Sequence, residues 1–337
     1  MSLKLMKVDS ASELPPEWDI LADEYYQTQE FLLHAERYNP CAQRYYLFYR
    51  EGTFVAGLVV YTLTINVFTY SILKIPFSMN VAGIPCSVSA SGFIGDEELF
   101  AFVFDLLKPL EKGFLTVLNL DFAPQIKDVM IGHTLPTITL QNGFKCWDDY
   151  LDSLRSDYRR RFSRISAAFS GVRTVAGDCS LYSEDMHLLY LEVLAHTKGK
   201  LETLSSAFFR NLPQAFRLTA YYEQERLLGW YISTAYQDRF YFFLGGFDYQ
   251  ANPKYQTYFN LLYELLREGL EDRCAVLDFG QTAEVPKLRL GAKISPKWML
   301  GYHSNFLIRK LLITARGILE YASVFPETHT FTENKEQ

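Results

Sequence analysis

The chain repeats one pattern of strands and helices, and this repeat limits its fold more than any other feature. Apolar runs separated by polar turns predict strands over 45–49, 55–65 and 68–75, and again over 217–222, 228–236 and 239–244. Each set is followed by a loop, an amphipathic helix (92–113 or 252–272) and a further strand, "LTVLNLDF" or "CAVLDFG". Leu106 and Val117 recur as Leu265 and Val276, both 159 residues later. A duplicated unit is therefore predicted.

The repeat predicts two domains of the α/β (α+β) class, each a mixed, mostly antiparallel sheet flanked by helices. A chain of 337 residues also exceeds what one small core needs. The boundary is expected near Gly143, where "TLQNGF" leads into a new helix, so the domains are residues 1–143 and 144–337. Residues 298–337 begin as a strand followed by a helix, which predicts a C-terminal helical tail on the second domain.

Charge and cysteine content restrict the partners. The net charge of −6 and the pI near 5.6 argue against DNA as a partner, because the overall field repels nucleic acid. The five cysteines are far apart and have no metal-ligand spacing, so we expect no metal and a reducing compartment. Residues 1–20 lack the continuous apolar core of a signal peptide, and we expect a cytoplasmic protein.

Residues 54–73 carry no charge over a length that could span a bilayer. They are rich in Val, Thr, Tyr and Ile and follow the turn signal Glu51-Gly52, so we expect strands. The apolar helix expected over 306–321 leaves open a weak, peripheral association with membranes.

The order helix, three-strand meander, loop, helix and strand resembles that of the GNAT acyltransferases. Two copies in one chain resemble the FemABX-like family, which contains the tandem-GNAT aminoacyl ligases of bacterial peptidoglycan precursors. The stretches that carry this resemblance are "WDDYLDSLRSDYRRRFSR" (147–164), "SSAFFRNL" (205–212), "ERLLGWYISTAYQDRFYFFLGGFD" (225–248) and "VLDFGQTAEVPKLRLGA" (276–292). The resemblance implies transfer of an acyl or aminoacyl group from an activated ester or thioester to an amine, such as that of a cell-envelope precursor.

Two departures from the family leave the donor open. GNAT enzymes that use acyl-CoA usually carry a Q/R-x-x-G-x-G/A loop, and "GGFDYQANPKYQ" (245–256) lacks it. The ligases that use aminoacyl-tRNA often contain a charged coiled coil, and no heptad run is visible here. Acyl-CoA and aminoacyl-tRNA therefore both remain candidate donors.

The resemblance places Lys287, of a K-x-x-x-G element ending at Gly291, where the central strands of these folds splay apart. A lysine there could hold a phosphate or stabilise an oxyanion. Asp278 could accept the amine proton or orient Lys287. The structural alternatives are a solvated charge for Lys287 and a turn-stabilising carboxylate for Asp278, with Gly280 supplying a positive φ.

Further candidates flank these two residues. Main-chain N–H groups of Leu244, Gly245 and Gly246 are expected to polarise the acyl carbonyl, and Lys254 and Tyr255 to contact the donor. The expected acceptor-binding residues are Arg159, Arg160, Lys198, Gln281 and Arg289. Arginines suit a diphosphate, but Arg155, Arg159, Arg160 and Arg164 could also form only a solvated helix face.

The simplest signatures of serine hydrolases, zinc proteases and P-loop nucleotide hydrolases are missing from the sequence. A catalytically silent binding or scaffold protein remains the alternative, favoured by the missing phosphate-binding loop and opposed by the retained Asp278 and Lys287.

Overall fold

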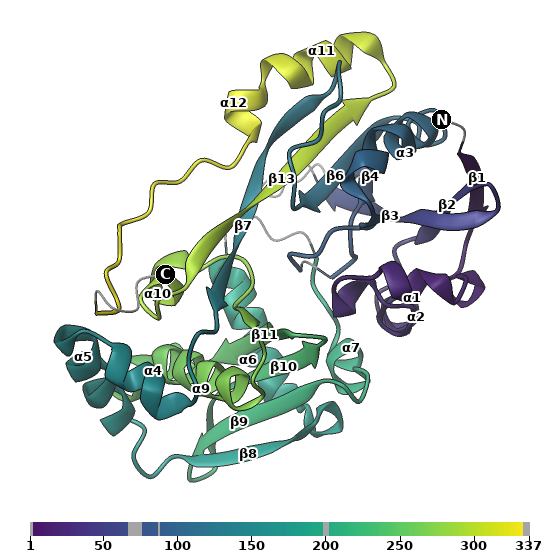
Figure 1. Ribbon diagram of the computed structural model, residues 1–337. Coiled ribbons are helices and arrows are strands. Elements are labelled where there is room, and N and C mark those ends of the chain that lie inside the picture. The colour runs from purple at the N-terminus through teal and green to yellow at the C-terminus, as the bar shows by residue number, and fades with distance from the viewer. Residues whose placement is uncertain (1–2, 67–75, 87, 198–201, 333–337) are drawn as a thin grey trace. The chain divides into compact units, whose positions relative to one another are not determined.

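The structure is a computed structural model that describes residues 3–66, 76–86, 88–197 and 202–332 (Figure 1). The chain divides into two compact units. Unit 1 contains Met1–Pro136 and Pro296–Ser323, and unit 2 contains Thr137–Ser295 and Val324–Gln337.

Unit 1 has the strand order β1-β2-β3-β4-β6-β13, with β5 paired to β3. Neighbours are antiparallel except for the parallel pair β4 and β6. The strands are β1 (Lys4–Val8), β2 (Arg44–Arg50), β3 (Thr53–Asn66), β4 (Pro76–Ala82), β5 (Phe93–Gly95), β6 (Phe114–Leu120) and β13 (Lys293–His303). The helices are α1 (Glu17–Leu21), α2 (Gln29–Tyr38), α3 (Phe100–Leu107), α11 (Phe306–Thr314) and α12 (Arg316–Leu319), with short 3-10 turns η1 (Ala11–Glu13), η2 (Tyr25–Gln27) and η3 (Glu97–Leu99).

Unit 2 has the strand order β7-β12-β11-β10-β9-β8, in which only β11 and β12 are parallel. The strands are β7 (Met130–Gln141), β8 (Arg173–Asp178), β9 (Arg217–Glu223), β10 (Arg226–Tyr236), β11 (Arg239–Phe247) and β12 (Val276–Asp278). The helices are α4 (Trp147–Ser153), α5 (Ser156–Ala167), α6 (Glu184–His196), α7 (Ser206–Arg210), α8 (Asn252–Tyr255), α9 (Thr257–Glu271) and α10 (Glu284–Leu288), with the 3-10 turn η4 (Cys179–Leu181).

Two helices cover opposite faces of the unit 2 sheet. Neighbouring residues of a strand point to opposite faces, and Trp230 and Tyr231 are neighbours in β10. The indole N–H of Trp230 donates to the Met186 carbonyl of α6 at 2.9 Å, and the Tyr231 hydroxyl donates to Glu268 of α9 at 2.8 Å. The amphipathic helix predicted within 252–272 is α9, which buries Leu261, Leu262, Leu265 and Leu266.

Both units repeat the predicted order of a three-strand meander, a helix and a parallel strand. The connection between them differs from the predicted one, since the units divide after Pro136 rather than near Gly143. β7 starts in unit 1 and pairs with β12 in unit 2, whereas β13 starts in unit 2 and pairs with β6 in unit 1. The tail expected in the second domain therefore contributes residues 296–323 to unit 1, because strand pairing decides where it packs.

The uncharged stretch 54–73 is strand β3 as far as Asn66, and its remainder lies outside the described residues, as does the strand predicted over 68–75. Among the described residues, no helix combines the length and the apolar character needed to cross a bilayer. α11 and α12 bury none of their side chains, and Leu307, Leu311 and Ile318 are 74%, 67% and 89% exposed. The peripheral membrane association expected from the sequence would have to use this surface.

The end of the chain closes over the turn that follows α10. Gly291 has φ +87°, and a Cβ built there would lie 2.2 Å from two ring atoms of Phe331. Phe331 is buried in the unit 2 core and bridges to Leu154. Close contact and positive φ together require glycine at this position.

We predict that Gly291→Ala lowers the free energy of unfolding by about 2 to 4 kcal/mol, because it adds a clash with Phe331 to the backbone strain. Gly171→Ala is the matched control, since Gly171 has φ +81° and open space around its Cα. It should cost only about 1 kcal/mol. Urea denaturation of both variants tests this, and equal losses would contradict the proposed contact.

Candidate active site in the second unit

The resemblance implied that two central strands of unit 2 splay apart, and in the structure the parallel strands β11 and β12 pair over a short length. β11 and β12 pair only over Arg239–Tyr241 and Val276–Asp278. β12 ends there, whereas β11 continues to Phe247. The register of β11 with β10 shifts between Ile232 and Ser233, which pair with Leu244 and Phe242 and leave Phe243 as a bulge. A bulge bends a strand, and this one lies just beyond the residues of β11 that pair with β12.

The register also decides which N–H groups of β11 face the side of β12. The Asp248 N–H donates to the Leu228 carbonyl at 2.9 Å, so this position is hydrogen-bonded to β10. Antiparallel pairs alternate, which turns the N–H groups of Gly246 and Leu244 toward β10 as well. Of the three predicted donors, the alternation leaves Gly245 on the side of β12, and it adds Phe247, which sequence reasoning missed.

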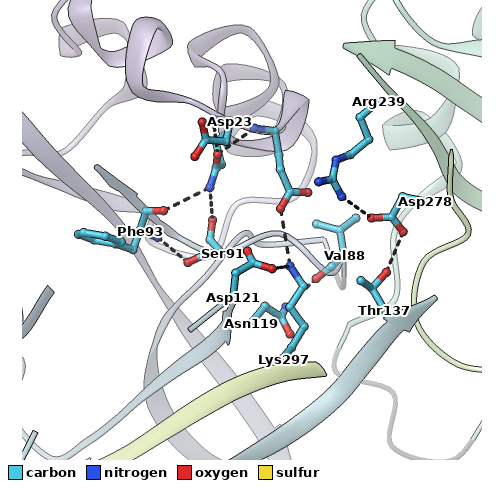
Figure 2. Close-up of polar contacts among 12 residues, drawn as sticks. Asp23, Val88, Ser91, Phe93, Asn119, Asp121, Thr137, Arg239, Asp278 and Lys297 are labelled. Carbon is cyan, nitrogen blue, oxygen red and sulfur yellow. Dashed lines mark hydrogen bonds and ion pairs between the residues drawn. The ribbon is translucent and has the colours of Figure 1, made fainter. Parts of the chain in front are cut away.

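Asp278 is held at the end of β12 by three groups, of which Figure 2 shows Thr137 and Arg239. Its carboxylate accepts hydrogen bonds from the Thr137 hydroxyl and the Gly280 N–H, both at 2.7 Å, and lies 3.6 Å from the Arg239 guanidinium. The contact with the Gly280 N–H matches the turn-stabilising alternative. Thr137 and Arg239 come from β7 and β11, and no sequence pattern linked them to Asp278.

Lys287 lies in α10 and is only 2% exposed. Its ammonium donates to the main-chain carbonyls of Gly280 at 3.3 Å and Gln281 at 2.8 Å, and it lies 6.0 Å from the centre of the Phe242 ring. Burial lowers the pKa of Lys287 to about 7, although the nearby carboxylates of Asp278 and Glu284 oppose this shift. The solvated alternative does not describe this side chain.

Protonation decides what Lys287 can offer to a ligand. An ammonium has three N–H donors, and two of them point to loop carbonyls. The third position is a donor when Lys287 is charged and a lone pair when it is neutral. With a pKa of about 7, both forms are accessible near neutral pH. Gln281 contributes to this arrangement through its main-chain carbonyl.

A row of aromatic side chains follows the end of β11. The rings of Phe247 and Tyr249 lie 4.4 Å apart, His196 stacks on Tyr249 at 4.2 Å, and Tyr258 lies 5.3 Å from Phe247. Sequence analysis did not single out Phe247 or Tyr249. Their spacing of two residues at a strand end was the available signal, since such residues share a side.

Two predicted donor-binding residues have other partners. Lys254 is exposed and forms an ion pair with Glu223 of β9 at 3.2 Å. Tyr255 is buried in a small apolar cluster with Leu228 and Ala251. These contacts connect both residues to neighbouring elements rather than to Lys287.

The predicted acceptor-binding residues do not form one group in the structure. Arg159 donates to the carbonyls of Asp152 and Leu154, and Arg160 forms an ion pair with Asp157. Lys198 lies outside the described residues. Arg289 follows α10 and is half-buried near Arg161 of α5, a residue that was not predicted.

The first turn of α9 already has a side-chain partner. The Asn252 carboxamide accepts the Tyr258 N–H at 3.0 Å, and this N–H is among those that a helix leaves unpaired at its start. Such groups commonly bind phosphates. Among the described residues, no group of three His, Cys, Asp or Glu side chains is placed to hold a metal ion.

Comparison with known proteins identifies this architecture. Residues 152–287 match the family model of the acetyltransferase (GNAT) domain. The structure of FemX is similar, with a TM-score of 0.50, 12% identity, and coverage of 80% of this chain and 90% of that one. A tandem GNAT protein from the clavulanic acid biosynthesis pathway has a TM-score of 0.50 and 11% identity, covering 90% and 99%.

A conserved protein of unknown function from Bacteroides thetaiotaomicron has a TM-score of 0.53 and 7% identity, covering 88% of this chain and 99% of that one. A comparison with curated proteins gives no match. At these identities the structural likeness establishes the fold, and the predicted resemblance is confirmed at that level. Residues 152–287 therefore match an acetyltransferase (GNAT) domain, and the chain shares the fold of FemX and of a tandem GNAT protein.

Proposed function

We propose that unit 2 transfers an acyl or aminoacyl group from an activated ester or thioester to an amine. The observation that carries this proposal is the buried ammonium of Lys287 beside the diverging strands β11 and β12. Burying a charge costs free energy, so a buried charge is usually retained because it has a partner or a function. The GNAT match supports the same reaction type.

The reaction needs hydrogen-bond donors more than it needs a nucleophile from the protein. The acceptor amine attacks the acyl carbon, a C–N bond forms, and negative charge develops on the carbonyl oxygen. The third N–H of charged Lys287 and the N–H groups of Gly245 and Phe247 are the donors proposed to stabilise this oxyanion. The C–S or C–O bond then breaks, the thiolate or alkoxide takes up a proton, and the amine nitrogen loses one.

The donor belongs to one of two classes, acyl-CoA or aminoacyl-tRNA, and the acceptor is an amine. GNAT domains commonly use acyl-CoA, and the resemblance to peptidoglycan ligases favours a cell-envelope precursor as acceptor in the cytoplasm. A non-catalytic binding protein is the second candidate. It is favoured by Asn252, which occupies an N–H at the start of α9 where GNAT enzymes commonly bind a phosphate.

We expect Lys287→Met to lower kcat about 100-fold or more, the usual effect of removing one oxyanion donor. The assays are thiol release from acetyl-CoA with a panel of amines and, separately, aminoacyl transfer from charged tRNA. Lys145→Met, which removes an exposed lysine of the same unit, is the control and should retain activity. Wild-type turnover in Lys287→Met would rule out the proposed role, and no turnover by wild type with any donor would favour the binding protein.

The pH dependence tests which protonation state acts. If charged Lys287 donates to the oxyanion, the rate ratio of wild type to Lys287→Met falls as pH rises through about 7. The ratio cancels titration of the acceptor amine, which affects both proteins. A ratio that rises over pH 6 to 9 would instead identify neutral Lys287 as a proton acceptor, contrary to this proposal.

The stability of the fold should also depend on the titration of Lys287, but it should rise with pH where the contribution of Lys287 to the rate falls. The pKa of Lys287 is about 7 in the folded chain and 10.5 in the unfolded chain. Between these pH values the unfolded chain therefore binds one proton more than the folded chain. Stability therefore rises with pH across this window, by about 1.4 kcal/mol for each pKa unit of displacement. Lys287→Met should have a higher free energy of unfolding than wild type, and urea denaturation at pH 6, 8 and 10 should show that this difference becomes smaller as the pH rises. An advantage that stays constant would refute the burial argument.

A further inference from the structure

We propose that Arg161, Arg164 and Arg289, here called the arginine cluster, bind a phosphate group of the activated acyl donor. This inference rests on the proposed function, and it assigns the phosphate-binding role for which the sequence has no glycine-rich loop.

Arg161 forms the centre of the cluster. Its guanidinium lies 4.5 Å from the centre of the Phe259 ring of α9. The Nε atom of Arg161 is buried and has no hydrogen-bond acceptor among the described residues. Phe162 packs edge-on against Tyr263 at 4.9 Å, which holds α5 against α9 beside this guanidinium. A buried guanidinium donor without an acceptor indicates a missing ligand or water.

The surroundings of Arg161 add positive charge. Burial lowers the pKa of Arg161, and the positive charges of Arg289 and Arg164 lower it further. Arg164 lies three residues after Arg161 in α5, and Arg289 follows α10. Within the part of the chain that the structure describes, none of these three side chains forms an ion pair with a carboxylate. Like charges gathered without a counterion repel each other, so an anion would stabilise the cluster.

The side chain of Arg161 interacts with Tyr263 of α9 but leaves its Nε without an acceptor, whereas the neighbouring arginines of α5 have carbonyl or carboxylate partners. Arg159 is satisfied by two main-chain carbonyls, and Arg160 by Asp157. Arg161 is next to them in α5 but turns toward α9. Charge counting along the helix cannot make this distinction.

The cluster lies next to the proposed reaction site along two elements. In α10 and its end, Lys287 contacts the loop after β12, and Arg289 follows two residues later beside Arg161. In α9, Tyr258 contacts Phe247 of β11, and Phe259 contacts Arg161. A donor whose acyl carbon lies near Lys287 could therefore place a phosphate near the cluster.

Arginine is suited to this ligand. Its planar guanidinium binds phosphate oxygens in pairs of parallel hydrogen bonds and remains charged when partly buried. Coenzyme A and the 3′ end of tRNA both carry phosphate esters of a nucleotide. The shared chemistry is a nucleotide phosphate, and the experiment must distinguish the two sources.

The test is calorimetric titration of the full chain with inorganic pyrophosphate, coenzyme A and deacylated tRNA, each in separate measurements. We expect Arg161→Met and Arg289→Met each to weaken binding of the cognate probe about tenfold or more. Methionine keeps the apolar contact with Phe259 while removing the charge. Arg161→Lys keeps the charge without the bidentate geometry and should have an intermediate effect. Thermal denaturation confirms that each variant is folded.

Arg173→Met is the matched control, because Arg173 also lies over an aromatic ring, that of Tyr222 at 4.8 Å, in the same unit. Its binding should equal that of wild type. If the cluster variants weaken the binding of coenzyme A, the phosphate belongs to coenzyme A. If they weaken the binding of tRNA, it belongs to tRNA. Unchanged binding in Arg161→Met and Arg289→Met, or no binding of any probe by wild type, would overturn the inference.

The two proposals fail separately. If the variants lose probe binding but wild type transfers no acyl group, the phosphate site stands and the proposed reaction does not. If wild type transfers acyl groups and the cluster variants keep its KM for the donor, the reaction stands and the phosphate site does not.

Discussion

The brief parallel pairing of β11 and β12 is the constraint on which the rest of unit 2 depends. Three residue pairs hold the strands together, and beyond them β12 ends while the bulged strand β11 continues to Phe247. Two consequences follow from this geometry. N–H groups of β11 have no neighbouring strand to bind on that side, and the turn after Asp278 presents its carbonyls to Lys287. Both are features that a reaction at a carbonyl group can use.

The two copies use corresponding positions differently. Asn119 lies 159 residues before Asp278 and therefore occupies the same place in the repeat. Its side chain donates to the Val88 carbonyl at 2.8 Å, whereas Asp278 accepts hydrogen bonds and supplies negative charge (Figure 2). Unit 1 has its own buried lysine, Lys297, but this residue lies 2.6 Å from Asp121 and 3.9 Å from Glu24. Lys297 is in direct contact with the Asp121 carboxylate, which favours a structural ion pair, whereas the hydrogen bonds of Lys287 go to main-chain carbonyls.

Burial affects the protonation and the ligand preference of two cationic side chains in unit 2, Lys287 and Arg161. Lys287 and Arg161 are each removed from solvent in part by aromatic rings, Phe242 and Phe259. In this setting a lysine loses its proton more readily, whereas an arginine keeps its charge and needs an anion. The same physical environment therefore leads to a titrating donor at one place and a binding site for phosphate at the other.

The sequence by itself determined the duplication and the meander and helix order of each copy, and it singled out residues 276–292 as a candidate site. These depend on local periodicity and on short motifs, which the chain carries without reference to distant contacts. It also singled out Lys287 and Asp278 as candidates, because a strand end followed by a K-x-x-x-G element resembles the pattern of the family.

Tertiary structure alone decided which partners these residues have. Thr137 and Arg239 reach Asp278 from strands far away in the sequence, and the exchange of β7 and β13 depends on pairing that no local pattern encodes. The arginines show the same limit. Helical spacing grouped Arg159 and Arg160 on a basic face, but packing of α5 against α9 selected Arg161 and brought Arg289 to it. Side-chain burial depends on what an element packs against, and a sequence pattern describes only the element itself.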